Sequence, residues 1–407
     1  MQWVDGGVTE PRGFRASGVR SGVKKEGLDL AIVECSTEAV CAGLFTTNKV
    51  KAAPVVVSME RLRRTGGRAR AVVLNSGNAN ACTGERGRRD ALATASRAAS
   101  LMDMPDEEVL VASTGVIGRP LPIDKVLRGL EEAVARLSSS RESSRRAARA
   151  IMTTDMTEKE ACVKLDGETR GVTIAGMAKG AGMIHPNLAT MLSVVTTDAR
   201  IEPEALDAAV RRAADQTFNM ITVDRDTSTN DTLLVFSSGL SGPVLREGTK
   251  AFSNFERGLL AVFQSLATKM VRDAEGAGKV FEILVTGART LEDARVCART
   301  IASSNLVKTA VFGSDPNWGR IVAAAGYSGA DIDPDLISIT LVRGSESLRW
   351  VHRGVLVSEE ANKRAALILS EDSFKVIVDL GLGDSSATAW GCDLSYEYVR
   401  INSEYTT

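Results

Sequence analysis

The sequence feature that most constrains the fold is a recurring pair: a short apolar run followed directly by a loop of glycine, asparagine and other small polar residues. The apolar runs occupy residues 70–74, 109–112 and 308–312, and their loops are residues 75–80, 113–118 and 313–320. Each pair predicts a buried strand that ends in a polar loop at one edge of a sheet. Functional residues commonly lie on such loops, so we expect the functional site at this edge.

Amphipathic helices are predicted between these strands, which indicates a mixed α/β fold. They cover residues 85–101, 123–137, 203–217, 255–272, 290–303 and 359–369. Strands are expected at 374–378 and at 387–402, the latter with a polar tail, whereas 138–149 is typical of a linker and 239–250 of a loop. A chain of 407 residues exceeds one ordinary core, so we expect a separate C-terminal α/β domain from about residue 280.

The composition excludes several classes of protein. A net charge of −1 without a basic tail argues against nucleic acid or an anionic membrane as the main partner. Residues 1–7 lack the basic and apolar regions of a secretory signal, and no apolar run approaches the length of a membrane span. The cysteines show neither a CxxC pair nor a Cys/His metal spacing. We therefore expect a cytoplasmic enzyme or binding protein.

Histidine is scarce, and this limits the catalytic chemistry. The chain has only two histidines, His185 and His352, so Ser/His/Asp and Cys/His arrangements have few ways to form. A histidine-rich metal site is excluded for the same reason. The glycine-rich loops also fail as nucleotide motifs. Gly278-Lys279 lacks both the first glycine and the Ser/Thr of a Walker loop, and the loop at 180–182 lacks the third glycine of a dinucleotide fingerprint.

The loop at residues 176–190 is unusual because it combines three glycines with a Pro-Asn pair and ends in Ala189-Thr190 before a predicted strand at 191–195. A hydroxyl there could attack the preceding carbonyl, form an ester and let water open the chain. The new α-amine of Thr190, with an ordinary pKa near ~8, could then serve as the base that this histidine-poor chain lacks. On the residues alone, a plain tight loop entering a strand is the favoured interpretation.

Eight strings in order, spread over nearly the whole chain, resemble the ornithine acetyltransferase family, also called the bifunctional glutamate N-acetyltransferases of arginine biosynthesis. They are residues 74–84 (LNSGNANACTG), 113–118 (STGVIG), 152–155 (MTTD), 177–192 (MAKGAGMIHPNLATML), 224–231 (DRDTSTND), 273–276 (DAEG), 315–320 (DPNWGR) and 401–407 (INSEYTT). One such string would be weak, but eight in order are very specific.

The resemblance implies a self-cleaving acyltransferase with a layered αββα-type sandwich, as in amino-terminal-nucleophile enzymes, and a smaller C-terminal α/β domain. Cleavage between Ala189 and Thr190 would give an alpha chain, 1–189, and a beta chain whose first part is 190–280 and whose C-terminal domain is 281–407. Thr190 would take the acetyl group of N2-acetylornithine and pass it to glutamate by a ping-pong route. The family assembles as a heterotetramer, two copies of each chain, and needs no cofactor or metal.

The resemblance also assigns the site residues. Thr114 and Gly115 would form the oxyanion hole, and the substrate contacts would be Thr153, Lys179, Thr190, Glu275, Asn402 and Thr407. Lys179 suits the carboxylate of N-acetylornithine and Glu275 its ammonium. Either charge could instead lie at the surface, and Thr154 competes with Thr153 for its role.

Two further motifs receive no chemical role. The loops at 75–84 and 224–231 are expected to cap turns and hold site loops in place. The acidic residues Asp224, Asp226 and Asp231 lack the glycine and terminal glutamate of an EF-hand, so a structural role is favoured over a metal site. His185 is expected to be a packing or hydrogen-bonding residue rather than the base.

Three alternatives stay open. The same nucleophile and oxyanion hole would serve an amino-terminal amidase or aminopeptidase of related fold, although serine would be expected at its nucleophile position. A non-catalytic binding or scaffold protein is the second. The third is use of acetyl-CoA as an additional acetyl donor, because no residue distinguishes the family members that use it from those that do not.

Overall fold

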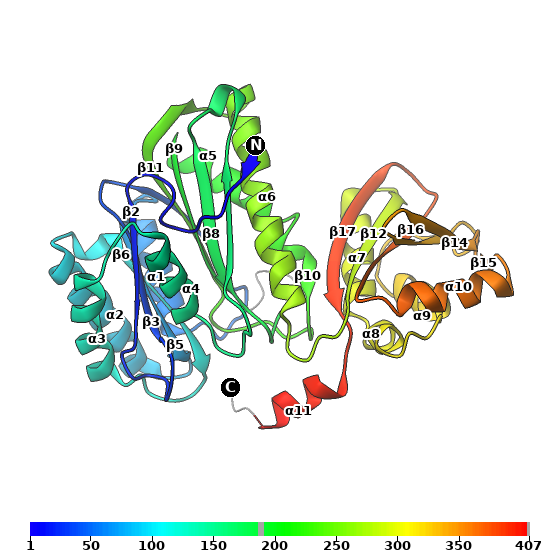
Figure 1. Ribbon diagram of the computed structural model, residues 1–407, viewed down its shortest axis with the longest axis horizontal. Coiled ribbons are helices and arrows are strands. Elements are labelled where there is room, and N and C mark those ends of the chain that lie inside the picture. Colours follow the sequence, from blue (N-terminus) through cyan, green and yellow to red (C-terminus); the bar gives the residue numbers. More distant parts are fainter. Residues whose placement is uncertain (186–190, 405–407) are drawn as a thin grey trace.

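The computed structural model describes residues 1–185 and 191–404, which form a larger N-terminal part and a smaller C-terminal part side by side (Figure 1). The larger part contains two sheets. The six-stranded sheet has the order β1 (Gln2–Trp3), β7 (Lys159–Lys164), β8 (Thr173–Lys179), β9 (Leu192–Ile201), β11 (Thr232–Leu245) and β4 (Val40–Phe45). The four-stranded sheet has the order β2 (Phe14–Val19), β3 (Leu30–Cys35), β5 (Ala71–Asn78) and β6 (Val109–Val116).

The two sheets pack face to face and carry helices on their outer faces. Met177 and Leu234 of the six-stranded sheet share one buried core with Val33 and Leu110 of the four-stranded sheet. The outer faces are covered by α5 (Pro203–Ala214) and α6 (Lys250–Arg272) on one side, and by α1 (Ala53–Arg64), α2 (Gly84–Met102) and α3 (Ile123–Ala135) on the other. The layers are therefore helix, sheet, sheet and helix, which confirms the predicted αββα fold class.

Helix α6 illustrates why the sequence folds this way. The Thr249 side chain accepts a hydrogen bond from the backbone N–H of Phe252 and so caps the helix. Phe255, Leu259 and Val262 then recur at helical spacing and are fully buried against the six-stranded sheet. The helix ends at Arg272, two residues before the buried Ala274, and the chain enters the functional region at Glu275.

The smaller part is built on a seven-stranded sheet. Its order is β10 (Ile221–Thr222), β17 (Ser385–Cys392), β12 (Val280–Ala288), β16 (Ser373–Asp379), β13 (Ser338–Arg343), β14 (Glu346–His352) and β15 (Val355–Leu356). Its helices are α7 (Leu291–Ser303), α8 (Asn305–Phe312), α9 (Trp318–Gly326) and α10 (Glu359–Leu369). The short strand β10 comes before α6 in the chain but pairs with β17 of this sheet. The two parts are therefore connected by this strand as well as by the chain near residue 280.

The predicted strand at 308–312 is wrong. These residues lie in α8, where Val307, Ala310 and Val311 form one buried helical face and the Ser304 side chain caps the first turn. A short apolar run fits a strand or a helix equally well, and here the cap and the tertiary packing decide. The loop that follows, 313–320, therefore does not join the strand-end loops of the larger part.

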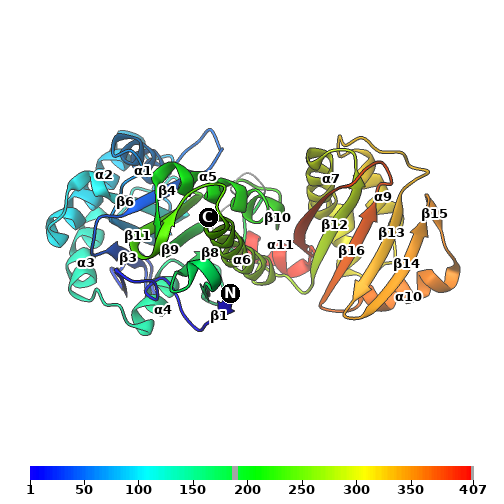
Figure 2. The same ribbon diagram turned by 90° about the horizontal axis from the view of Figure 1, so that it is seen from above.

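Three other boundaries also differ from expectation. Residues predicted as a linker form α4 (Arg141–Ala150), whose alanines enter the core between the two sheets. The predicted loop at 239–250 begins late, because β11 continues to Leu245 through an irregular register against β9. The polar tail expected after the last strand is a helix, α11 (Tyr396–Glu404), which lies between the two parts in both views (Figure 2).

The strands that come before and after the junction between residues 189 and 190 in the sequence both belong to the six-stranded sheet. Strand β8 precedes it, β9 follows it, and the two pair antiparallel from Ile174 with Thr197 to Lys179 with Leu192. Strand β9 also pairs with β11, and β11 with β4. Segments on both sides of the junction thus share one sheet and one core. Among the described residues, no helix is long and apolar enough to cross a membrane.

Candidate active site

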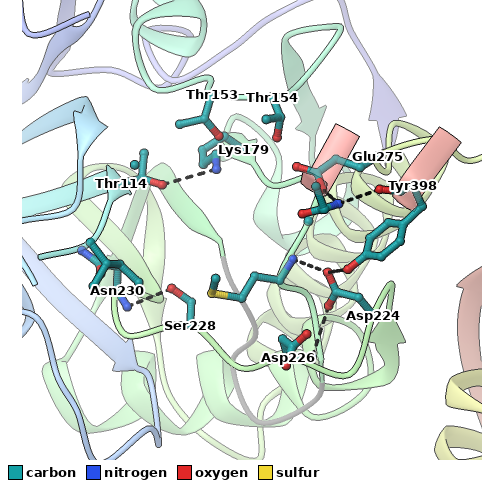
Figure 3. A pocket seen from close by; sticks show the side chains of 15 residues that line it. Thr114, Thr153, Thr154, Lys179, Asp224, Asp226, Ser228, Asn230, Glu275 and Tyr398 are labelled. Carbon is teal, nitrogen blue, oxygen red and sulfur yellow. Dashed lines mark hydrogen bonds between the residues drawn. The ribbon is translucent and has the colours of Figure 1, made fainter. Parts of the chain in front are cut away.

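A pocket of about 100 Å³ that opens to solvent lies where β6 and β8 end (Figure 3). Its walls come from segments far apart in the chain: the end of β6, the loop after α4, the end of β8, the 224–231 segment, the residue stretch after α6, and α11. The lining residues are Thr114, Gly115, Ile117, Thr153, Thr154, Lys179, Gly182, Met183, Asp224, Asp226, Ser228, Asn230, Glu275, Tyr398 and Asn402.

The structure brings together in one pocket all the sequence-predicted site residues that it describes. Six of them line this one pocket: Thr114, Gly115, Thr153, Lys179, Glu275 and Asn402. Thr154 lines it as well, so the pocket does not choose between the two threonines. The predicted cleavage residue Ala189, the predicted nucleophile Thr190 and the C-terminal Thr407 lie outside the described residues.

Thr114 and Gly115 sit at a distorted strand end. Strand β6 pairs parallel with β5, and the register becomes irregular where Gly77 opposes Gly115. Gly115 has φ +130°, and a Cβ there would lie 2.4 Å from the carbonyl carbon of Gly77. Only glycine can occupy this position, since both the conformation and the close backbone approach exclude a side chain. Thr114 and Gly115 both line the pocket, so this strand end brings a hydroxyl group and backbone to its wall.

Lys179 is a buried cation whose charge is only loosely compensated. It is the last residue of β8 and is 3% exposed, so it is not a surface charge. Its ammonium has three donors, but its Nζ lies 3.4 Å from Thr114 Oγ1 and 3.9 Å from the nearest Asp155 oxygen. Burial lowers the pKa of Lys179, and the charge of Asp155 opposes that shift. The arrangement can bind an anionic group that enters the pocket.

Asp155 holds the backbone around this lysine. One of its oxygens accepts hydrogen bonds from Lys159 Nζ at 2.6 Å and from the Gly180 N–H at 2.7 Å, and the other accepts from the Thr153 N–H at 3.0 Å. Burial opposes ionisation of Asp155, but the charges of Lys179 and Lys159 prevail and lower its pKa to about 2. Sequence reasoning placed Asp155 inside a family string without giving it a role.

Glu275 provides the opposite charge in the lining of the same pocket as Lys179 (Figure 3). It is 8% exposed, and its Oε2 accepts a hydrogen bond of 2.8 Å from the Asn402 amide on α11. Its backbone N–H donates to the Ala181 carbonyl at 2.9 Å, which joins the stretch after α6 to the glycine loop after β8. Glu275 and Asn402, which were each predicted as substrate contacts, therefore lie within hydrogen-bond distance of each other.

We expect Gly182→Ala to impair the site with little effect on the rest of the fold. A Cβ at Gly182 would lie 2.4 Å from Glu275 Oε2 and 2.6 Å from its Cδ, so the carboxylate would have to move. The apparent KM for a cationic substrate should rise about 10-fold, which corresponds to a weakened charge-assisted hydrogen bond. Steady-state kinetics beside a thermal melt would check this. An unchanged KM would show that Glu275 does not contact the cation.

Asp224 and Tyr398 are pocket residues that sequence reasoning missed as a pair. The Tyr398 hydroxyl donates to Asp224 Oδ2 at 3.2 Å, and the same carboxylate accepts hydrogen bonds from the Met183 and Ile184 N–H groups. Burial raises the pKa of Asp224 to about 6. The only sequence signal for this role was the polar 224–231 string, and the contact with Tyr398 depends on the unpredicted helix α11.

The remaining candidates have other positions. His185 is not among the lining residues. Its Nδ1 lies 3.3 Å from Thr222 Oγ1, and burial together with the charge of Arg225 lowers its pKa to about 4. It is neutral near pH 7, as a packing or hydrogen-bonding residue would be. Within residues 1–185 and 191–404, no group of three His, Cys, Asp or Glu side chains is arranged to hold a metal ion.

Comparison with known proteins agrees with these observations. A family model described as the ArgJ family matches residues 15–407. The chain belongs to the ArgJ family. It is 48% identical over 408 residues, with complete coverage of both chains, to the arginine biosynthesis bifunctional protein ArgJ of Caldanaerobacter subterraneus subsp. tengcongensis. It is 47% identical over 407 residues, again with complete coverage of both, to the glutamate N-acetyltransferase of Methanosarcina mazei.

Solved ArgJ structures also match. The crystal structure of ornithine acetyltransferase from Mycobacterium tuberculosis, complexed with ornithine, is 42% identical and covers 47% of this chain and 99% of that chain, with a TM-score of 0.44. Membership of the ArgJ family makes this chain an enzyme of the acyltransferase class and places it among the proteins of arginine biosynthesis.

Proposed function

We propose that this ArgJ protein transfers the acetyl group of N2-acetylornithine to glutamate through an acetyl ester on Thr190. In this proposal the chain first cleaves itself between Ala189 and Thr190. The observation that carries the substrate assignment is the pair of opposite, buried charges that line one pocket, Lys179 and Glu275. The relatives named glutamate N-acetyltransferase and the ornithine-complexed neighbour support the same substrates.

The charges of the pocket match those of N-acetylornithine. This substrate carries one carboxylate and one side-chain ammonium. In the proposed complex Lys179 donates to the carboxylate, for which it has unused donors, and Glu275 accepts from the ammonium. Thr153, Asn402 and Thr407 would complete the contacts to substrate. Because both charged side chains are buried, each contact would be made away from water and would orient the acetyl group.

Thr114 and Gly115 would stabilise the oxyanion. Attack of the Thr190 hydroxyl on the acetyl carbonyl places negative charge on the carbonyl oxygen, and preorganised donors lower the free energy of that state. The Thr114 hydroxyl accepts from Lys179 Nζ, which leaves its own hydrogen free to donate toward the pocket. Collapse of the intermediate breaks the C–N bond, and ornithine leaves with the proton that the attacking hydroxyl lost.

The base in this proposal is the α-amine of Thr190. His185 and His352 are absent from the lining of the pocket, so the histidine base of other acyl-transfer sites has no counterpart there. An N-terminal amine with an ordinary pKa near ~8 can accept the hydroxyl proton and return it to the leaving amine. Glutamate then attacks the acetyl ester by the reverse sequence of steps and leaves as N-acetylglutamate.

Several consequences follow for the assembly. The two chains made by cleavage would stay associated, since β8 and β9 are hydrogen-bonded neighbours. We propose a heterotetramer of two alpha and two beta chains, acting in the cytoplasm without a cofactor. Synthesis of N-acetylglutamate with acetyl-CoA as donor is a separate activity, which an assay with glutamate and acetyl-CoA alone would detect.

The exchange itself is tested by incubating the purified protein with N-acetylornithine and glutamate. N-acetylglutamate and ornithine should form in equal amounts, and double-reciprocal plots at several glutamate concentrations should be parallel. An amidase or aminopeptidase of related fold would instead release acetate at a rate that glutamate does not reduce. Release of acetate faster than formation of N-acetylglutamate would therefore refute the transferase in favour of the hydrolase.

We expect Glu275→Gln to raise the KM for N-acetylornithine about 10- to 100-fold, because a hydrogen bond to a charged group is replaced by a neutral one. The second half-reaction, with glutamate, should change less, since glutamate has no side-chain ammonium. Glu34→Gln is a matched control: Glu34 is 3% exposed and paired with Arg15, away from the pocket lining. An unchanged KM in Glu275→Gln would make the ammonium assignment wrong.

A further inference from the structure

The 224–231 segment runs beside both ends of the loop that contains the proposed cleavage site. On the near side, the Asp224 carboxylate accepts from the Met183 N–H at 2.5 Å and from the Ile184 N–H at 2.9 Å. On the far side, Asp231 Oδ1 accepts from the Met191 N–H at 3.1 Å. Carboxylates at the two ends of one segment thus hold the chain shortly before residue 186 and directly after residue 190.

Backbone hydrogen bonds reinforce the same contacts. The Val223 N–H donates to the Ile184 carbonyl at 2.8 Å, and the Thr232 N–H donates to the Met191 carbonyl at 2.9 Å. Met191 therefore has both its N–H and its carbonyl fixed by Asp231 and Thr232. Since Met191 is covalently joined to Thr190, whatever holds Met191 also limits where Thr190 can lie.

Asn230, the residue before Asp231, makes a second connection to the pocket. Its side-chain amide donates to the Ala79 carbonyl at 2.6 Å and to the Ser113 carbonyl at 2.8 Å. Ser113 directly precedes Thr114. Two adjacent residues, Asn230 and Asp231, therefore link the neighbour of the proposed oxyanion donors to the neighbour of the proposed nucleophile.

The burial of the Asp231 carboxyl group costs folding free energy. Its residue is 1% exposed, and its Oδ2 has no hydrogen-bond partner among the described residues. Burial also raises the pKa of Asp231 well above its ordinary value. A buried carboxyl group with an unsatisfied oxygen costs folding free energy, so its position needs a reason beyond one hydrogen bond to β9.

We infer that Asn230 and Asp231 are positioning residues, which set the distance between the Thr190 nucleophile and the oxyanion donors at Thr114 and Gly115. The inference rests on the proposed function. Its physical basis is that Met191, the neighbour of the nucleophile, leads into β9, whereas Thr114 and Gly115 lie on β6, and these strands belong to different sheets. The Asn230 amide crosses that boundary, from the segment before β11 to Ser113 of β6. Asp231, the next residue, fixes Met191 on the six-stranded side.

The test compares Asp231→Ala with Asp231→Asn. Alanine removes the acceptor for the Met191 N–H, and a misplaced nucleophile should slow both self-cleavage and the kcat of the purified cut protein about 10- to 100-fold. The KM for N-acetylornithine should change less than about 3-fold, because Lys179 and Glu275 are untouched. Asparagine keeps one carbonyl oxygen as acceptor and should restore both rates to within about 3-fold of the unmodified protein.

Asp198→Ala is the matched control. Asp198 is also 1% exposed and accepts backbone hydrogen bonds, from Thr173 at 2.8 Å and Arg12 at 3.2 Å, but it is not a pocket residue. It should lower the melting temperature without changing cleavage or kcat. If Asp231→Ala does not fold, Asn230→Ala tests the other half of the link with the same two readouts.

The outcomes separate this inference from the proposed function. If the unmodified protein neither cleaves nor exchanges acetyl groups, the proposed function fails. If it does both, and Asp231→Ala behaves like Asp198→Ala, only the positioning role is overturned. A slow Asp231→Ala that asparagine does not rescue would also overturn it, because charge rather than the acceptor position would then be responsible.

Discussion

A Thr190→Ala variant is expected to remain a single chain of 43.2 kDa and to lose exchange between N-acetylornithine and glutamate completely. Alanine has no hydroxyl to attack the preceding carbonyl, so the chain cannot open by the proposed route. It also cannot form the acetyl ester, so the loss of kcat should exceed about 10⁴-fold. Denaturing electrophoresis and an exchange assay on the same sample would measure both effects.

Thr190→Ser is the control for this variant. Serine retains the hydroxyl and should still cut and still transfer acetyl groups, at reduced rates. Far-ultraviolet circular dichroism of the alanine variant should match that of the unmodified protein, because β8 and β9 already pair in the uncut chain. An alanine variant that cleaves, or that exchanges acetyl groups at more than a trace rate, would contradict the account.

Lys179→Met should produce the second-largest loss, with kcat/KM about 100- to 1000-fold lower. Methionine is close to lysine in volume, so packing should be kept while the buried positive charge disappears. Asp155 would then keep only Lys159 among the two lysines that face it. The effect should appear with N-acetylornithine and with glutamate alike, since both substrates carry an α-carboxylate.

That double effect distinguishes Lys179 from Glu275, whose neutralisation should weaken binding of N-acetylornithine more than binding of glutamate. Lys308→Met provides the control for burial. Lys308 is 1% exposed and makes a hydrogen bond to the Cys392 carbonyl in the smaller part, so its loss should cost stability without altering KM. If Lys179→Met changed stability alone, as Lys308→Met should, Lys179 would be a structural cation and the substrate assignment would fall.

The sequence predicted most of the fold because the signals for those helices and strands were local. Strands β5 and β6 combine apolar runs with Asn- and Gly-rich ends, and α2, α3 and α10 repeat apolar residues at helical spacing. Prediction failed where tertiary packing decides. Residues 308–312 are too short a run to separate strand from helix, and the Arg- and Ser-rich stretch of α4 conceals a buried alanine face.

The site residues could be predicted only as members of separate short sequence motifs that resemble a known family. Thr114, Lys179 and Glu275 are far apart in the chain, and no local pattern indicates that they line one pocket. Asp155 and Tyr398 had no predicted role, and Asp224 had only a general structural one, because their roles depend on contacts rather than on spacing. Helix α11 is decisive here: it carries Asn402 to Glu275 and Tyr398 to Asp224, and its sequence suggested only a polar tail.

The acetyl-enzyme is the central claim, and intact-mass analysis of the protein mixed with N-acetylornithine in the absence of glutamate addresses it. We predict two chains, residues 1–189 and 190–407, of which the second gains the mass of one acetyl group at Thr190. Addition of glutamate should remove that mass and release N-acetylglutamate in equal amount. An uncut chain that still exchanges acetyl groups, or an acetyl group carried on any other residue, would contradict the account.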